Sequence, residues 1–193
     1  LCFYPVKSIA RNKVWKDDLT LFTTDVKVSK NSAKSNCSAG GKLWEEGKKT
    51  KNKKKQAEYY LLSEKYLRRA VEIHPIYNDA WLLLGNVLFD SREEISEAAK
   101  CYLNILGRNP LHTNAKQNID IVLQKSEDRE LQLKYYQELI KIFPSDFNTN
   151  YRLGVLYGRY LKQLDKGIEY LEKAVSVNSK SSDALKDLGT AYG

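Results

Sequence analysis

The spacing of three prolines constrains the fold of this chain more than any other feature of its sequence. Pro75, Pro110 and Pro144 are separated by 35 and 34 residues, and Ser179 follows after another 35. A period of this length is typical of chains in which one small unit stacks on copies of itself. We therefore expect the residues between these positions to follow the same pattern in each unit.

Residues at fixed distances from these four positions share their size and polarity. Small or compact residues lie twelve positions earlier, at Ser63, Ala98, Gln132 and Gly167. Larger side chains lie eight positions earlier, at Leu67, Tyr102, Tyr136 and Leu171. Ten positions later stand Gly85, Asp120, Gly154 and Gly189. Four units in phase indicate a repeat array rather than a chance match.

Each unit is predicted to contain two antiparallel helices, as the family resemblance described below implies. The predicted pairs are 78–91 with 94–107, 113–126 with 129–142, and 147–160 with 165–177, and 182–193 begins a further first helix. Upstream, 31–47 and 56–75 are predicted to form a divergent pair. Residues 14–30 are predicted to form an amphipathic second helix, with one apolar stripe of Trp15, Leu19, Phe22 and Val26.

The recurring glycine is expected to have a packing role. Glycine inside a helix costs about 1 kcal/mol relative to alanine, so its return at one register needs a reason. We expect Gly85, Gly154 and Gly189 to lie where the first helix of a pair meets the second most closely. At Asp120, we expect a splayed pair or a carboxylate that points away. Gly107, at a predicted helix end, is expected to matter through its backbone conformation instead.

This pattern resembles the tetratricopeptide repeat, in which Trp, Leu, Gly, Ala and Pro recur over 34 residues. Trp81, Leu84, Gly85 and Pro110 match it, and Asp120, Ser179, Gln132 and Gly167 depart from it. The resemblance covers 57–193 well and 15–56 loosely. It implies an all-α fold, a right-handed superhelix of antiparallel helix pairs.

Positive charge is concentrated at the front of the chain. Residues 1–56 hold 14 Lys and Arg against 5 Asp and Glu, whereas the remainder holds 18 against 19. Much of the excess lies in the run KKTKNKKK, at 48–55. We predict that this run is a mobile, protease-sensitive insertion in a turn. Attraction to lipid headgroups or to nucleic acid is the alternative interpretation.

The domain organisation follows from these patterns. We expect a linker or membrane-proximal stub at 1–13, N-terminal helices and a divergent first repeat at 14–56, and the repeat array at 57–193. The sequence contains no methionine, which is typical of a piece of a longer protein or of a processed product. The last helix carries Leu185, Leu188 and Tyr192, so we expect further repeats after it or fraying of its end.

The front of the chain has a second resemblance, carried by Arg11, Asn12, Trp15, Asp17, Leu21 and Phe22. These residues resemble the junction in membrane proteins of the TMTC type and their bacterial relatives, where a glycosyltransferase-like membrane half precedes the repeats. The resemblance implies a membrane tether upstream and repeats on the extracytoplasmic, or periplasmic, side. Net positive charge favours the cytoplasm instead, but that tendency is weak for long domains. The simpler interpretation is that Arg11 and Asn12 cap a helix and Trp15 packs in the core.

No catalytic, cofactor or metal site is predicted. Cys2, Cys37 and Cys101 lack metal-ligand spacing, and His74 and His112 lie far apart in the sequence. Cys101 is expected to pack as a small hydrophobe. The fragment is therefore predicted to have no enzymatic activity, although a full-length protein would carry it if the membrane resemblance holds.

The predicted function is that of a protein–protein interaction scaffold. The resemblance places an extended peptide on the concave face formed by the first helices, whose residues here mix amides, aromatic and apolar groups. The predicted positions are Asp79, Leu82, Asn86, Phe89, Asn114, Gln117, Ile121, Gln124, Asn148, Tyr151, Val155 and Arg159. Leu82 stands where family members that clamp a C-terminal carboxylate have lysine.

Two other functions remain open. One is a freestanding soluble, cytoplasmic adaptor. The other is a basic loop that binds nucleic acid or headgroups, and the lack of aromatic residues among the lysines argues against nucleic acid.

Overall fold

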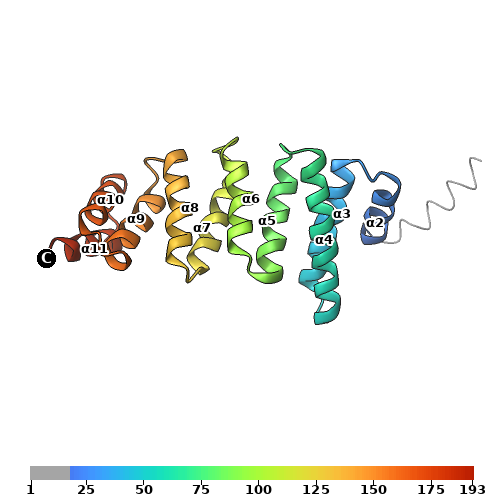
Figure 1. Cartoon of the computed structure of the whole chain (residues 1–193), viewed down its shortest axis with the longest axis horizontal. Coiled ribbons are helices and arrows are strands. Elements are labelled where there is room, and N and C mark those ends of the chain that lie inside the picture. The colour runs from blue at the N-terminus through green and yellow to red at the C-terminus, as the bar shows by residue number, and fades with distance from the viewer. Residues whose placement is uncertain (1–17) are drawn as a thin grey trace, which may run out of the picture. The chain divides into compact units, whose positions relative to one another are not determined.

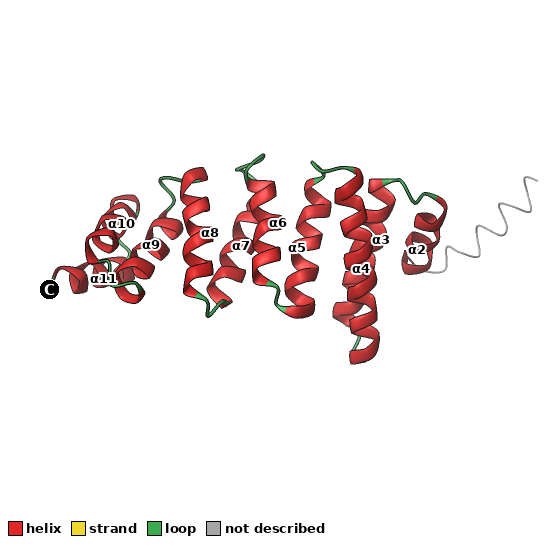
Figure 2. Cartoon of the chain, viewed as in Figure 1, coloured by secondary structure: helices red, strands yellow, loops and turns green. Residues whose placement is uncertain are grey.

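The computed structural model describes residues 18–193, and within that range every regular element is a helix (Figure 2). Contacts divide the chain into an N-terminal unit that ends at Ile105 and a C-terminal unit, Leu106–Gly193. Figure 1 labels the helices. They are α2 (Asp18–Val28), α3 (Ala33–Lys49), α4 (Lys53–Ile73), α5 (Asn78–Arg92), α6 (Ile95–Leu106), α7 (Thr113–Lys125), α8 (Arg129–Ile142), α9 (Phe147–Val155), η1 (Leu156–Tyr160), α10 (Leu164–Val177) and α11 (Ser182–Tyr192). The all-α prediction and its pairing pattern are confirmed.

The N-terminal unit is built around the α3–α4 pair. Helix α2 packs on α3, and α5 packs on both α4 and α3. Helix α6 lies against α5, where the Tyr102 hydroxyl donates to Asn86 Oδ1 at 2.9 Å. The fully buried core of this unit includes Leu43, Leu67, Leu84 and Leu88. These are the apolar positions that helical spacing places on inward faces.

The C-terminal unit repeats the same arrangement. Helix α9 packs on α8 and on α10, and α10 packs on α11. Its core includes Ile119, Leu123, Leu139, Leu153 and Leu171, all at most 3% exposed. Since a single helix pair cannot cover both of its apolar sides, each pair depends on its neighbours for burial.

The recurring glycine faces the recurring large residue in every pair that has one. A Cβ added to Gly85 would lie 2.6 Å from a ring carbon of Tyr102, and one added to Gly154 would lie 2.7 Å from Leu171 Cγ. The predicted packing role is therefore confirmed at these two positions. At Gly189, which lies in the last helix of the described residues, no atom lies within 4 Å of such a Cβ. Its contact with the second helix of a pair therefore stays a prediction.

The small position, twelve residues before each turn, is buried in all four units. Where the residue is polar, a hydrogen bond to the first helix compensates for burial. Ser63 Oγ donates to the Gly40 carbonyl at 2.6 Å, and Gln132 Nε2 donates to the Leu123 and Ser126 carbonyls at 2.8 and 2.9 Å. At this position, Ser63 and Gln132 therefore join the two helices of their pairs by hydrogen bonds.

The lysine run at 48–55 is not a loop, which corrects the prediction. Lys48 and Lys49 end α3, residues 53–55 begin α4, and only 50–52 connect them. The Asn52 side chain caps α4 by accepting from the Lys55 amide at 3.1 Å. In Figure 1 this hairpin extends past the end of α5.

The cause of this longer hairpin is a second glycine contact that sequence reasoning missed. Gly40 is the contact glycine of this pair, since its added Cβ would lie 2.6 Å from Leu67 Cγ. Gly47 lies two turns further on the same face and meets Tyr60, with 2.5 Å to a ring carbon. Gln56 Nε2 also donates to the Gly47 carbonyl at 3.0 Å. Lysine content indicates exposure, whereas the contact of Gly47 with Tyr60 packs the ends of α3 and α4 against each other.

The ends of several helices add local detail. Helix α8 is capped by Asp128, which accepts from the Leu131 amide at 2.9 Å. No glycine of residues 18–193 has a positive φ, so Gly107 has no left-handed backbone to preserve. The predicted helix 147–160 ends in a π-helical turn, η1.

Several predictions concern residues outside the described range. Arg11, Asn12, Trp15 and Asp17 of the membrane-junction resemblance lie there, as does Cys2. Leu21 and Phe22 lie in α2, where Phe22 is half-buried. None of the helices within 18–193 has the length and hydropathy that a bilayer span requires.

Candidate peptide-binding surfaces

The twelve predicted binding positions all lie on the first helix of a pair. Four are on α5, four on α7, three on α9, and Arg159 is in η1. None is buried, so all keep some surface available. Because their contacts differ between the two units, each unit is described separately.

In the N-terminal unit, a groove of about 480 Å³ contains two of the predicted positions, Asp79 and Leu82. We call it the α3–α5 groove. Its apolar surface comes from Phe22 of α2 and from Leu82 and Leu83 of α5. Its charged residues are Asp18, Lys42, Glu45 and Asp79.

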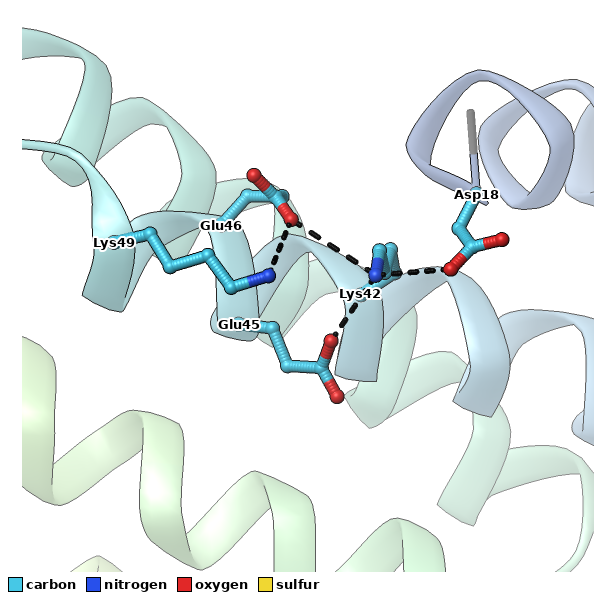
Figure 3. A network of polar contacts seen from close by, with 5 residues as sticks. All are labelled: Asp18, Lys42, Glu45, Glu46 and Lys49. Atoms are coloured by element: carbon cyan, nitrogen blue, oxygen red, sulfur yellow. Dashed lines mark hydrogen bonds and ion pairs between the residues drawn. The ribbon is translucent and has the colours of Figure 1, made fainter. Parts of the chain in front are cut away.

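An ion-pair network connects three of the lining residues of the α3–α5 groove, Asp18, Lys42 and Glu45 (Figure 3). Lys42 Nζ lies 3.1 Å from the Asp18 carboxylate and 3.2 Å from Glu45, and Glu46 is 3.9 Å away. The hydrogen bond with Asp18, followed by that with Glu45, raises the pKa of Lys42. The single cation of the groove is thus shared among three carboxylates, and α2 is joined to α3.

Asp79 gives the groove an available carboxylate. It is exposed in the first turn of α5, and no Lys or Arg within 18–193 lies at ion-pair distance from it. The α3–α5 groove therefore combines an apolar wall with an excess of negative charge.

Cys37 lines the same groove, but burial makes its thiol unreactive. The side chain is 5% exposed, and burial raises its pKa to about 11, against the lowering effect of a hydrogen bond with Tyr77. Burial also raises the pKa of Tyr77 to about 12. A thiolate is the nucleophilic form of cysteine, so this pair stays neutral at physiological pH.

Cys101 behaves in the same way. It is 3% exposed, and burial raises its pKa to about 12. The prediction that it packs as a small hydrophobe is confirmed. Within residues 18–193, no three His, Cys, Asp or Glu side chains are grouped so that they could hold a metal ion.

In the C-terminal unit, a pocket of about 290 Å³ brings together Gln117, Ile121 and Asn148 from the predicted set. We call it the α7–α9 pocket. Lys116 crosses it, with Nζ 2.6 Å from Asp146 Oδ1 and 4.6 Å from the centre of the Phe143 ring. Two amides, a cation–carboxylate pair and the apolar side chains of Ile119, Ile121, Leu139 and Phe143 therefore share this opening.

Asp120, which replaces the recurring glycine, also lines the α7–α9 pocket. Its carboxylate accepts from the Tyr136 hydroxyl at 2.8 Å and from Gln124 Nε2 at 2.7 Å. Helices α7 and α8 approach one another less closely than α9 and α10 do. The predicted splaying is confirmed, whereas the alternative, a carboxylate that points away, is wrong.

Some predicted binding residues already have partners within the chain. Tyr151 and Arg159 both contact Asp187 of α11, at 3.0 and 2.8 Å, and Val155 lies beside them in a small pocket of about 130 Å³. Asn86 Oδ1 is occupied by Tyr102. A peptide would have to compete for these groups, while Asp79, Gln117 and Asn148 have no such internal contact within residues 18–193.

Sequence reasoning missed Phe22 as a groove residue, because nothing in the sequence shows that α2 and α5 line one opening on α3. It also missed a larger cavity in the N-terminal unit, of about 910 Å³, which none of the twelve positions lines. Of the basic residues at its rim, Lys27 and Lys30 belong to the N-terminal charge excess, whereas Lys65, Arg68 and Arg69 lie in the part of the sequence whose charge is balanced.

The comparisons with known proteins agree with this architecture. Residues 147–181, which span α9, η1 and α10, match the family described as tetratricopeptide repeat. A solved structure described as YrrB, a TPR protein with an unusual peptide-binding site, is similar with a TM-score of 0.54 and 18% identity, over 89% of this chain and 81% of that one. The chain has the tetratricopeptide repeat fold.

Two structures of MamA have the same fold. Their TM-scores are 0.52 and 0.51 at 16% identity, and each alignment covers 86% of this chain and 83% or 89% of the other. A search among curated protein sequences found no match. At these identities the likeness concerns the fold alone, so binding has to be argued from the residues of this chain.

Proposed function

We propose that this repeat domain is a protein–protein interaction scaffold that binds extended peptides along the first helices of its pairs. The observation that carries the proposal is the α3–α5 groove, where Asp79 and Leu82 face a shared opening of about 480 Å³. Binding sites for small ligands commonly have volumes of about 300–1,000 Å³, with apolar walls and few polar groups.

The chemistry of the groove points to one class of peptide. Phe22, Leu82 and Leu83 would accept an apolar side chain. Asp79 would accept from a Lys or Arg of the ligand or from its backbone amides, since it has no cation partner within 18–193. The expected ligand is therefore an extended segment in which an apolar residue adjoins a basic one.

A displayed library of random short peptides tests this proposal, followed by affinity measurements on the resynthesised sequences. We expect selected peptides to contain Leu or Phe next to Lys or Arg. Leu82→Glu should weaken their binding by about tenfold or more, since it places a charge in the apolar wall. Asp79→Asn should weaken peptides with a basic residue more than those without one.

Leu111→Glu is the matched control, because Leu111 is 89% exposed and lies outside the groove. It makes the same chemical change without touching the proposed site. Equal losses for Leu82→Glu and Leu111→Glu, or selected peptides that lack the expected composition, would overturn the proposed site.

We further propose that the domain belongs to a membrane-anchored, glycosyltransferase-like protein and faces the extracytoplasmic side. The support is the resemblance carried by Arg11, Asn12, Trp15, Asp17, Leu21 and Phe22. The alternative is a freestanding soluble adaptor with the same binding surface. Nucleic acid is not the expected partner, because no aromatic residue stands within 48–55 to stack on bases.

Fractionation of cells that express the full-length protein separates the two contexts. A tethered protein should stay with membranes after an alkaline wash, and protease should digest the repeats once the outer membrane is permeable. Release into the soluble fraction would support the freestanding adaptor. Protection until the inner membrane is broken would place the repeats in the cytoplasm.

A further inference from the structure

The larger cavity of the N-terminal unit lies between α2 and α4, with its floor on α5. We call it the α2–α4 groove; its volume is about 910 Å³. None of its lining residues belongs to the α3–α5 groove. They are Val26, Lys27, Lys30, Asn36, Lys65, Tyr66, Arg68, Arg69, Val71, Glu72, Trp81 and Leu84.

The rim of the α2–α4 groove is strongly basic. Five of its lining residues are Lys or Arg and one, Glu72, is acidic. Arg69 is paired with Glu72 at 2.8 Å, and Arg68 with Glu64 at 2.8 Å. No carboxylate of residues 18–193 lies at ion-pair distance from Lys27, Lys30 or Lys65. Three positive charges of the rim therefore have no ion-pair partner within residues 18–193.

Hydrogen bonds hold the rim in place. Arg69 Nη2 donates to Asn31 Oδ1 at 2.9 Å, which joins the turn after α2 to α4. The buried side chain of Asn36 donates to the Lys30 carbonyl at 2.9 Å and to the Ser32 carbonyl at 2.8 Å. The backbone that carries Lys30 is thus fixed relative to the groove, and little order has to be gained when a ligand binds.

The floor of the groove is apolar. Val26 and Leu84 are 2% and 1% exposed, and the half-buried rings of Tyr66 and Trp81 form the walls. The Trp81 indole donates to the Pro75 carbonyl at 2.7 Å, which fixes the ring. A flat polyanion would reach the rim but leave this floor empty, whereas a protruding apolar side chain would fill it.

We propose that the α2–α4 groove binds an acidic segment of a partner protein that inserts one or two apolar side chains between its carboxylates. The basic rim and the apolar floor together select this chemistry by charge and shape complementarity. The chain's own residues 1–17 do not fit, because they carry Lys7, Arg11, Lys13 and Lys16 against Asp17. This surface is independent of the α3–α5 groove and has the opposite charge preference.

Fluorescence anisotropy with three labelled synthetic peptides tests the proposal. The first probe is a run of Asp and Glu around a central Phe-Leu pair, the second keeps Phe-Leu but replaces the acids by Lys, and the third is acidic without Phe-Leu. We expect the first peptide to bind the protein more tightly than either of the other two peptides. Its affinity should fall as salt is raised, since part of the attraction is between exposed charges.

Charge reversal in the groove provides the decisive variant. Lys30→Glu with Lys65→Glu should weaken the first peptide by about tenfold or more, because two unpaired cations become repulsive. Both side chains are exposed and have no ion-pair partner within 18–193, so the fold should be kept, and circular dichroism checks this. The matched control is Lys53→Glu with Lys54→Glu, which makes the same charge change on exposed lysines outside the groove.

Three results would overturn the proposal. Equal weakening by the two double variants would mean that net charge, not the groove, attracts the peptide. Equal binding of the acidic peptides with and without Phe-Leu would mean that the apolar floor is not used. Tighter binding of a single-stranded oligonucleotide, lost in the Lys30→Glu, Lys65→Glu variant, would assign the groove to nucleic acid instead.

Discussion

Two helix pairs of the C-terminal unit occupy equivalent places in the repeat but are held together by different forces. In α9–α10, Gly154 lets the backbone approach Leu171, and a Cβ added to Gly167 would lie 2.8 Å from Gly158 Cα. In α7–α8, Asp120 stands at the glycine position and binds the Tyr136 hydroxyl across a wider gap. One pair is closed by steric fit and the other is bridged by polar contacts.

The comparison shows how a repeat can lose its signature glycine and still form a pair. Residues of the bridged pair line the α7–α9 pocket, of about 290 Å³. At the equivalent glycine of the closed pair, the two helices are in close contact instead. The stability of the bridged pair depends on the hydrogen bond between Asp120 and Tyr136, because a buried polar group that loses its partner destabilises the fold. We therefore expect the closed pair to be sensitive to side-chain volume and the bridged pair to polar substitution.

The largest effect is expected from filling the closed pair. Gly154→Leu should destabilise the domain by about 1–3 kcal/mol or more, because its side chain would overlap Leu171 and overpack the helix contact. Urea unfolding followed by circular dichroism measures the change. Gly189→Leu is the matched control, since nothing lies within 4 Å of that position; an equal loss there would refute the packing explanation.

Removing the link at the start of α9 should have the next largest effect. Asp146 accepts from the Thr149 amide at 2.9 Å as the helix cap and from Lys116 at 2.6 Å. Asp146→Ala should cost about 1–2 kcal/mol, as loss of a cap does. Asp146→Asn keeps a capping oxygen and should lose less; equal losses for both variants would assign the effect to the charge alone.

The same residue makes a prediction about pH. Burial acts to raise the pKa of Asp146, but hydrogen bonds from Lys116 and Thr149 outweigh it and hold the pKa below its ordinary value. A lowered folded pKa stabilises the protein above the unfolded value, about 3.9, and this stability is lost as pH falls through the folded value. The stability difference between wild type and Asp146→Asn should therefore shrink below about pH 4. A pH-independent difference would contradict this account.

A double-mutant cycle on Asp120 and Tyr136 tests the polar bridge itself. Asp120→Ala and Tyr136→Phe should each cost about 1 kcal/mol, and the double variant should cost less than their sum because the second change removes an already lost hydrogen bond. A coupling energy near zero would mean that the bridge does not hold α7 to α8. The hydrogen bond between Asp120 and Tyr136 would then not explain how this pair stays together without the glycine.

The smallest effect is expected where the closed pair meets α11. Arg159 is paired with Asp187 at 2.8 Å, but its side chain is 60% exposed. Arg159→Met should change stability by less than about 1 kcal/mol, since exposed ion pairs are weak. A loss as large as that of Gly154→Leu would show that the pair depends on charge, and the contrast between the two helix pairs would fail.

The repeat and its helix pairs were determined by the sequence alone. Proline spacing, the recurring Gly85 and Gly154, and helical apolar spacing predicted the boundaries of α5 to α11 to within a few residues. These features are local or periodic, so they are visible without knowing what each helix contacts. The burial of Cys101 followed from the same periodicity.

Only the tertiary structure decided how each pair is closed and where grooves form. The lysine run became the tip of a packed hairpin because Gly47 meets Tyr60, and the carboxylate of Asp120 turned inward because Tyr136 offers a hydroxyl. Phe22 of α2 lines the same groove as Asp79 and Leu82 of α5, although the two helices are far apart in the sequence. Such contacts depend on side chains that meet across helices, and a one-dimensional pattern shows which faces are apolar but not which residues will share an opening.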